Sequence, residues 1–128
     1  KKANDDVMVL AMIETREAVQ NLDAILAVEG IDGIYVGPSD LGLSLGYEPT
    51  LEPTAPEVLE AIGLIVSRAR AAGRIAGIHT GSTAMIRRMQ AQGFHFGTLL
   101  TDVRLFANAL AGQLAILKDT AAQTVTGY

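Results

Sequence analysis

The stretch VMVLAMIETREAVQNLDAILAVEGIDGIYV, residues 7–36, decides the fold because its hydrophobic period changes twice. Val7 to Ile13 is a continuous apolar run, which is typical of a strand buried on both faces. From Arg16 to Val28 the apolar residues recur at helical spacing, and Gly30 is expected to end that helix as its C-terminal cap. A second apolar run, Ile31 to Val36, completes a predicted β-α-β unit.

The same alternation continues to the end of the chain. The further predicted elements are a helix from about residue 55 to Ala72, a strand from Ile75 to His79, a helix ended by Gly93, a strand from Phe94 to Leu100 and a helix from Val103 to Lys118. Four consecutive β-α units with continuously apolar strands predict an α/β fold, with a parallel sheet covered by helices. Two architectures fit this pattern, a small open sheet or half of a (β/α)8 barrel, because a complete barrel needs about 250 residues.

Local signals predict how these helices begin and which side chains they bury. Thr54 and Glu57 have the spacing of a capping box around Pro56, and Ser82 or Thr83 is expected to cap the helix that Gly93 ends. Two sets of apolar residues are expected to face the core. They are Met8, Met12, Met85 and Met89, and, in the last helix, Leu105, Phe106, Ala109, Leu110, Leu114 and Leu117.

Composition and charge exclude several classes of partner. The 128-residue chain is 49% apolar and 19% charged, which is typical of a globular domain, and its net charge is −4. No basic run is longer than Arg87-Arg88, so nucleic acid and anionic membranes are not expected as partners. Cysteine is absent, which excludes disulfides and thiolate metal sites, and no apolar stretch reaches the roughly 18 residues that a membrane span needs. We therefore expect a cytoplasmic protein.

Polar residues follow each predicted strand, at the edge of the sheet where parallel α/β proteins bind their ligands. These residues are Glu14-Thr15, Ser39-Asp40, His79-Thr80 and Thr101-Asp102. Glu14 and Asp40 are about one β-α unit apart, so they are expected to project from neighbouring strands at one rim. Two adjacent carboxylates repel each other unless a proton or a cation lies between them. A hard divalent cation such as Mg²⁺ or Mn²⁺ suits such a pair.

Structural roles remain open for each of these side chains. Glu14 could cap the helix that starts at Arg16, and Asp40 could belong to a turn in the following loop. His79 has the alternative of a purely structural role, and His95 is expected to point toward the helices. Arg16 is the basic side chain nearest to this rim in the sequence, and a surface ion pair is the expected role for it.

Residues 3–46, ANDDVMVLAMIETREAVQNLDAILAVEGIDGIYVGPSDLGLSLG, resemble the HpcH/HpaI aldolases. These are the class II pyruvate aldolases, which include 2,4-dihydroxyhept-2-ene-1,7-dioate aldolase and 2-keto-3-deoxy sugar acid aldolases. The likeness continues through residues 77–110, GIHTGSTAMIRRMQAQGFHFGTLLTDVRLFANAL, and covers nearly the whole chain. The pair I-E-T and G-P-S-D-L at this spacing is the specific part of the resemblance.

The resemblance implies that residues 1–128 form one domain, the second half of a (β/α)8 TIM barrel with strands five to eight. It implies that Glu14 and Asp40 are the two protein ligands of a divalent metal, Mg²⁺, Mn²⁺ or Co²⁺. Backbone N–H groups around Ser39 and Asp40 would take the carboxylate of pyruvate, and Gly37-Pro38 would let the backbone approach this substrate.

The activity that the resemblance implies is that of a metal-dependent aldolase, a lyase that cleaves or forms 2-keto-hydroxy acids through a pyruvate enolate. Its partners would be pyruvate or another 2-keto acid and an aldehyde, whose identity the residues do not specify. No lysine lies at a predicted strand end, which disfavours a Schiff-base mechanism. A citrate lyase β-like acyl-CoA ester lyase is an alternative, although the sequence offers no basic cluster for the phosphates of coenzyme A. A half-barrel fragment without independent activity is another.

Two departures from the family pattern affect the expected site. Many members carry glutamine two residues before the metal glutamate, where this chain has Met12. The family's active-site arginine and histidine lie in the first half of the barrel, so the resemblance assigns no catalytic acid or base to this chain. The last helix is typically exchanged between subunits in this family. A homo-oligomer or the remainder of the barrel is therefore the expected partner of the chain.

Overall fold

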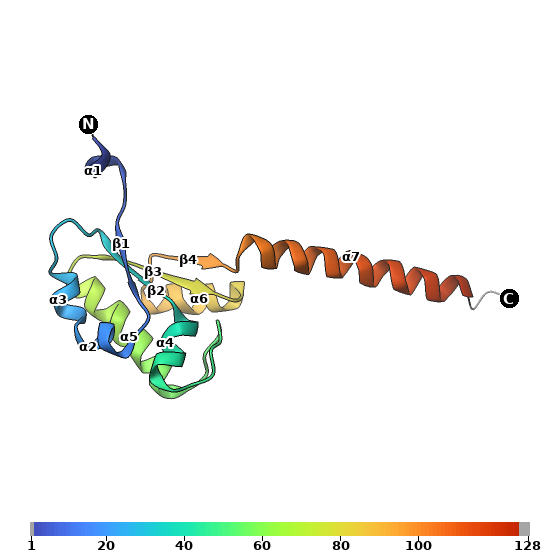
Figure 1. Cartoon of the computed structure of the whole chain (residues 1–128), viewed down its shortest axis with the longest axis horizontal. Helices are drawn as coiled ribbons and strands as arrows, with labels where there is room; N and C mark the ends of the chain where they lie inside the picture. Colours follow the sequence, from blue (N-terminus) through green and yellow to red (C-terminus); the bar gives the residue numbers. More distant parts are fainter. Residues whose placement is uncertain (1, 126–128) are drawn as a thin grey trace.

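The computed structural model describes residues 2–125, with side chains through Lys118. Strands and helices alternate along this part of the chain (Figure 1). The strands are β1 (Leu10–Ile13), β2 (Gly33–Val36), β3 (Ile75–Thr80) and β4 (Phe96–Leu99). The helices are α1 (Ala3–Asp6), α2 (Arg16–Gln20), α3 (Leu22–Leu26), α4 (Pro38–Leu45), α5 (Pro56–Ala71), α6 (Thr83–Gln92) and α7 (Asp102–Val125).

Within residues 2–125 the four strands form one sheet, and each strand runs parallel to its neighbours in the order β1-β2-β3-β4. The register pairs Ile13 with Val36 and Val36 with Ile78. The predicted parallel α/β sheet is therefore confirmed. The strands differ from the prediction mainly at their ends: the apolar run that begins at Val7 enters the sheet only at Leu10, because pairing with β2 starts at Gly33.

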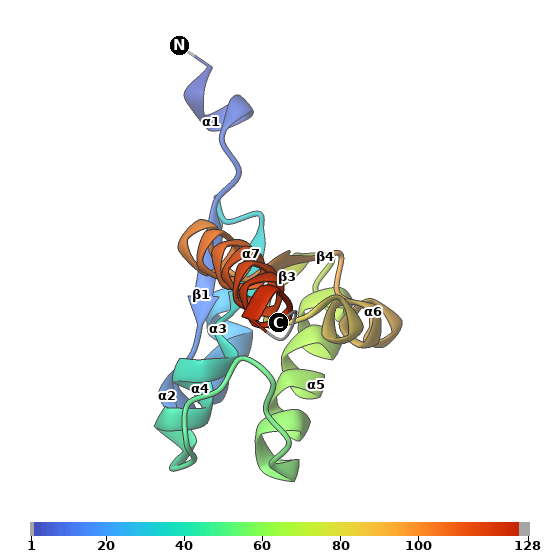
Figure 2. The ribbon, with the colours of Figure 1, turned by 90° about the vertical axis from the view of Figure 1, so that its right-hand side faces the viewer.

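The core lies between the sheet and the helices that cover one of its faces, chiefly α3, α4, α5 and α6 (Figures 1 and 2). Met85 and Met89 of α6 are buried there, as predicted. Met8 and Met12 are 58% and 53% exposed, so their predicted burial is wrong. Met12 lies on the sheet face that no helix covers within the described chain. The buried residues of the sheet are Ile13, Gly33, Ile34, Val36, Ala76, Gly77, Ile78 and Thr80.

The predicted helix from Arg16 to Val28 is interrupted and forms α2 and α3. Asn21, at φ −96° and ψ 12°, leaves the helical conformation, and its side chain donates a hydrogen bond to the carbonyl oxygen of Glu17. Helix α3 ends at Leu26, so the predicted cap at Gly30 is wrong. Asparagine favours such breaks because its short side chain competes with the helical backbone bonds.

The ends of α5 and α6 test the predicted caps. The N-cap of α5 is Ala55, without a side-chain cap, so the predicted capping box of Thr54 and Glu57 is not formed. Ser82 does cap α6, because its hydroxyl accepts a hydrogen bond from the N–H of Met85. The predicted end of α6 at Gly93 is confirmed by the left-handed conformation of that residue, at φ 108°.

Helix α4 follows β2 directly and was not predicted from the sequence. Pro38 occupies its first position, where the missing N–H costs nothing, and Gly46 ends it in the left-handed conformation at φ 96°. Ser39 and Asp40 therefore lie in the first turn of a helix. The alternative in which Asp40 belongs to a loop turn is wrong.

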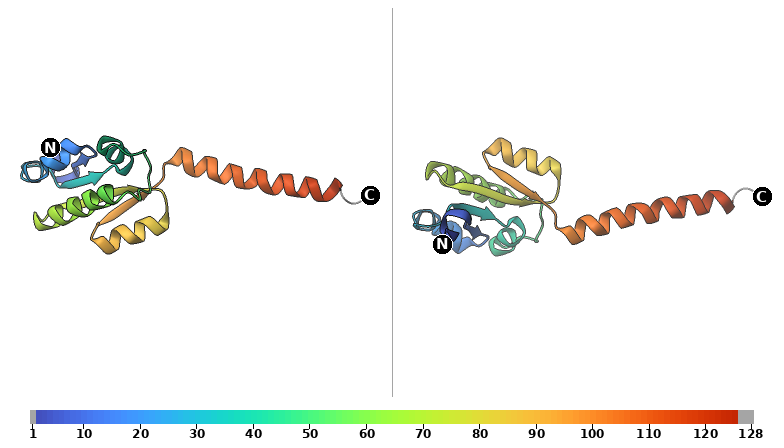
Figure 3. Two further views of the ribbon diagram at one scale, coloured as in Figure 1. Left: turned by 90° about the horizontal axis from the view of Figure 1, so that it is seen from below. Right: turned by 90° about the horizontal axis from the view of Figure 1, so that it is seen from above.

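Helix α7 extends away from the sheet and its helices (Figure 3). The apolar residues of α7 are exposed within the described chain, so their predicted burial is wrong. Among those predicted to be buried are Leu105 (46% exposed), Phe106 (72%), Leu110 (49%), Leu114 (47%) and Leu117 (66%). A search of the described helices, α7 included, finds none with the length and apolarity to cross a membrane.

Candidate functional site

Glu14 directly follows β1, on the sheet face that the helices leave open. Its half-buried side chain lies over Gly37: a Cβ placed at Gly37 would be 2.8 Å from Glu14 Oε2. The N–H of Gly37 donates a hydrogen bond to the carbonyl oxygen of Ile13 at 3.3 Å, which holds the two strand ends together. Thr15, rather than Glu14, caps α2 by accepting a hydrogen bond from the N–H of Ala18. Gly37 therefore leaves the space that the Glu14 carboxylate occupies.

Asp40 lies three residues beyond Gly37, in the first turn of α4. No side chain caps this helix, and the N–H groups of Ser39 and Asp40 have no backbone partner within the described chain. The positive end of the helix dipole favours negative charge at this place. The exposed Asp40 carboxylate and the two N–H groups thus share one end of α4.

The donor set at this edge fits a hard divalent cation. Neither Glu14 nor Asp40 forms a hydrogen bond or an ion pair through its carboxylate with any side chain described through Lys118. Hard cations such as Mg²⁺ take oxygen ligands and often use one or two carboxylates together with water or substrate oxygens. In the same part of the chain no cluster of three or more histidine, cysteine, aspartate or glutamate side chains could hold a metal ion.

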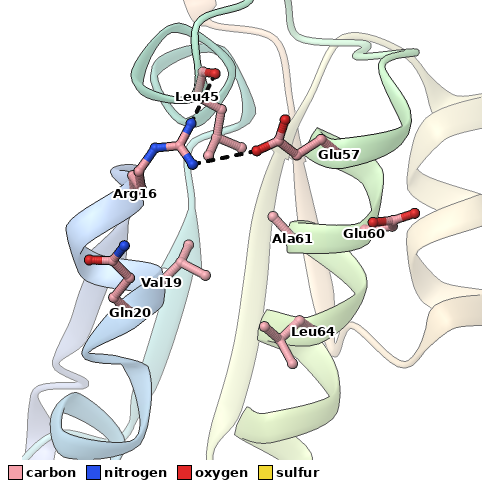
Figure 4. Close-up of a pocket in the computed structure, with 8 residues that line it drawn as sticks. All are labelled: Arg16, Val19, Gln20, Leu45, Glu57, Glu60, Ala61 and Leu64. Carbon is pink, nitrogen blue, oxygen red and sulfur yellow. Dashed lines mark hydrogen bonds and ion pairs between the residues drawn. The ribbon is translucent and has the colours of Figure 1, made fainter.

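Arg16 joins the Glu14 segment to the far end of α4. Its guanidinium donates a hydrogen bond to the carbonyl oxygen of Leu45 at 3.1 Å and pairs with Glu57 at 3.5 Å (Figure 4). Its backbone N–H donates a hydrogen bond to the Ser44 hydroxyl at 2.9 Å. The predicted surface ion pair of Arg16 is therefore confirmed. The residues drawn in Figure 4 line a cavity beside this contact, between α2 and α5. The cavity has a volume of about 380 Å³.

His79, at the end of β3, belongs to a hydrogen-bonded cluster on the open face. Its Nδ1 is 2.8 Å from the hydroxyl of Thr98 and 3.3 Å from that of Tyr35, and the two hydroxyls bond to each other. Sequence analysis noted His79 and missed its partners, because the cluster depends on the register of β2, β3 and β4. His95 is exposed, and its Nδ1 accepts a hydrogen bond from the N–H of Ala76.

Residues 1–109 match the family described as HpcH/HpaI aldolase/citrate lyase. The hydroxypyruvate/pyruvate aldolase of Rhizorhabdus wittichii is 45% identical over 108 residues, which cover 84% of this chain and 43% of that protein. The 2-keto-3-deoxy-L-rhamnonate aldolase of Klebsiella pneumoniae subsp. pneumoniae is 41% identical over 122 residues, which cover 95% and 45%. The chain therefore spans less than half the length of these relatives.

This chain is also similar to several solved structures. Citrate synthase SbnG superposes with a TM-score of 0.84 at 32% identity, over 94% of this chain and 48% of that one. An HpcH/HpaI aldolase/citrate lyase family protein from Burkholderia cenocepacia gives 0.82 at 30% identity, over 91% and 44%. The M. tuberculosis citrate lyase beta subunit, solved with oxaloacetate and magnesium, gives 0.61 at 20% identity, over 73% and 47%, which is a likeness of fold alone. By the match over residues 1–109, the chain belongs to the HpcH/HpaI aldolase/citrate lyase family.

Proposed function

We propose that residues 1–128 are the second half, strands five to eight, of a (β/α)8-barrel aldolase that cleaves or forms 2-keto-hydroxy acids. The sequential parallel sheet supports the barrel, because α3, α4, α5 and α6 cover one of its faces, as in a barrel wall. The length of the relatives supports it too, since this chain covers 43% and 45% of the two aldolases. The names of those relatives support the lyase activity.

One observation carries the proposed site. The Glu14 carboxylate lies on Gly37, and the Asp40 carboxylate follows in the first turn of α4, both without a partner among the side chains through Lys118. Glu14 and Asp40 would hold a divalent metal, Mg²⁺, Mn²⁺ or Co²⁺, and the N–H groups of Ser39 and Asp40 would receive the substrate carboxylate. Gly37 and Pro38 would form the floor beneath the substrate. In the complete protein Met12 would stand where many members have a polar side chain.

A metal bound to these carboxylates supplies a Lewis acid that stabilises negative charge on the keto oxygen. The C–C bond of the aldol substrate breaks, its hydroxyl gives up a proton, and the aldehyde leaves. The bonding electron pair remains on the three-carbon fragment as the pyruvate enolate, which then takes a proton at carbon to give pyruvate. The role of this chain is to bind and orient the 2-keto acid at the strand ends. The resemblance assigns the acid and base groups to the other barrel half.

The proposal includes the partners of the chain. The exposed apolar side chains of α7 require covering, either by a second copy of the protein or by the remainder of the barrel. Pyruvate and an aldehyde are the small-molecule partners. A cytoplasmic location belongs to the same proposal.

Calorimetric titration of the protein at its natural length tests the metal site. Mg²⁺ should bind weakly alone and more tightly with pyruvate or oxalate, whose oxygens complete the coordination shell. Asp40→Asn should lose this binding, and Glu17→Gln, a change at an exposed acid of α2, should keep it. Equal binding by wild type and Asp40→Asn would refute the assignment of the ligands.

A citrate lyase β-like acyl-CoA ester lyase is the second candidate, because the matched family includes citrate lyases. Such an enzyme must bind the phosphates of coenzyme A, and the sequence has no basic run longer than Arg87-Arg88. If coenzyme A competes with oxalate for binding to the Mg²⁺-loaded protein, this result would favour the acyl-CoA ester lyase over the aldolase.

A further inference from the structure

We propose that His79 is a substrate-binding residue, which bonds through Nε2 to an oxygen of the 2-keto acid held between Glu14 and β3. This inference rests on the proposed function and extends its site onto a third strand. The carboxylates and N–H groups described above come from β1 and from the start of α4. His79 would add a neutral hydrogen-bonding group on the other side of Gly37.

The register places His79 opposite the carboxylate. Val36 pairs with both Ile13 and Ile78. We infer that the residues that follow these three in sequence, Glu14, Gly37 and His79, continue the row across the sheet. Strands lie about 5 Å apart, so the Cα atoms of Glu14 and His79 are separated by about 10 Å, with only Gly37 between them. The Glu14 carboxylate already leans over Gly37. The row therefore has a carboxylate on one side, an imidazole on the other and no side chain in the middle.

The hydrogen-bond partners of His79 occupy Nδ1, so Nε2 is the ring nitrogen that can contact a ligand. We assign the donors as one continuous chain, in which the Tyr35 hydroxyl donates to Thr98 Oγ1 and the Thr98 hydroxyl donates to His79 Nδ1. The tyrosine phenol is the more acidic hydroxyl and starts the chain. This assignment makes Nδ1 the acceptor and places the ring N–H on Nε2. Nε2 has no hydrogen-bond partner among the side chains described through Lys118, so it is available to donate to a ligand oxygen.

The surroundings distinguish this cluster from ordinary barrel packing. The interior of such barrels is filled mainly by branched apolar side chains, whereas β2, β3 and β4 here contribute a phenol, an imidazole and a hydroxyl. Phe96 packs over Gly77 and its ring centroid lies 6.0 Å from that of Tyr35, which holds the phenol in place. Tyr35 and Thr98 are therefore positioning residues for His79, and His79 is the one residue of this cluster that contacts the ligand.

Titration of the Mg²⁺-loaded protein, at its natural length, with oxalate and with pyruvate tests the inference. Oxalate should shift the ¹⁵N resonance of His79 Nε2 and leave His95, which lies before β4, unchanged. His79→Leu should bind Mg²⁺ alone as wild type does and bind oxalate about tenfold more weakly, the loss of one hydrogen bond to a charged ligand. Thr98→Val should weaken oxalate less and move the Nδ1 resonance, because the imidazole keeps its place but loses its donor.

The outcomes separate this inference from the proposed function. If wild type does not bind oxalate in the presence of Mg²⁺, the proposed function fails and the inference fails with it. If wild type binds oxalate, while His79→Leu binds it equally and the His79 resonances do not move, the inference alone is overturned. The resonance measurement uses wild type, so it decides the question even if His79→Leu does not fold. His95→Leu is the matched control and should bind oxalate as wild type does.

Discussion

The guanidinium of Arg16 donates a hydrogen bond to the carbonyl oxygen of Leu45 at 3.1 Å, and so ties the first residue of α2 to the last residue of α4. Arg16 comes two residues after Glu14, and α4 carries Asp40 in its first turn. The contact therefore fixes the direction of α4 relative to the end of β1. It also places a positive charge at the negative end of the helix dipole, which is favourable.

Arg16→Met should lower the free energy of unfolding by about 1 kcal/mol. The Glu57 ion pair is half exposed and contributes little, so most of this effect comes from the charge-assisted bond to Leu45. Urea denaturation measures the change. Arg68→Met removes a comparable exposed ion pair, with Asp23, and should cost less than about 0.5 kcal/mol. An equal loss of unfolding free energy in both variants would mean that the bond to Leu45 adds nothing to the stability that a surface ion pair provides.

Gly37→Ala should weaken metal binding with little loss of stability. The added Cβ would lie 2.8 Å from Glu14 Oε2, so the carboxylate must move, while the backbone φ of −98° suits alanine. Calorimetry should give at least about a tenfold loss of Mg²⁺ affinity in the presence of oxalate. Gly63→Ala, in α5 with nothing within 4 Å of the new Cβ, is the matched control. It should bind metal normally and raise stability by roughly 0.5–1 kcal/mol.

Exchange of pyruvate methyl protons with deuterated water should require metal. The proposed enolate forms without any covalent bond to a lysine, so EDTA should abolish the exchange and added Mg²⁺ or Mn²⁺ should restore it. Proton NMR of pyruvate follows the reaction in the natural-length protein. Exchange that survives EDTA, or a pyruvate adduct trapped by borohydride, would indicate a Schiff base instead.

Tyr47 should titrate above the usual range of a phenol. Its hydroxyl donates to Glu57 Oε2 at 3.0 Å, and this bond, together with the negative charge of Glu57, raises the pKa of Tyr47; Arg16 opposes part of the effect. Because the pKa is higher in the folded state, the stabilisation is complete below the ordinary phenol pKa and is lost as pH rises through the folded value. Ring NMR of Tyr47 should show this shift, and Glu57→Gln should reduce it.

The protein should self-associate through α7 if a second copy covers that helix. Val103, Phe106 and Leu117 are 72%, 72% and 66% exposed, and such a concentration of apolar surface favours association. Phe106→Glu should reduce the mass measured by light scattering at micromolar concentration. Val28→Ser, a change at a half-exposed residue outside α7, should leave the mass unchanged. A monomeric wild type would refute the prediction.

The sheet could be predicted from the sequence because its strands are continuous apolar runs between helical segments. Their exact ends could not, because Val7 to Val9 are apolar but lie before the register with β2 begins. Helix α4 was missed because eight residues with an internal Gly42 give weak periodicity, although Pro38 and Gly46 mark its two ends. Those two signals together would have been enough to find it.

The candidate site could be predicted in part for a similar reason. Glu14 and Asp40 were found because they follow strand ends, and strand ends of a parallel sheet share one edge. Tyr35 and Thr98 were not found, because their contact with His79 depends on the register across three strands. Tyr35 and Thr98 point to the open face because side chains alternate along a strand. Ordinary core residues follow the same alternation, so the sequence of one strand does not distinguish the two roles.

The sequential order of the strands also affects how the chain can fold during its synthesis. Each strand pairs only with units next to it in sequence across residues 2–125, so pairing needs no segment that is synthesised much later. Parallel pairing requires a crossover of a dozen or more residues, so each strand joins after a whole β-α unit has left the ribosome. Synthesis from the N-terminus therefore produces the segments that carry Glu14 and Asp40 before β3 and β4 are made.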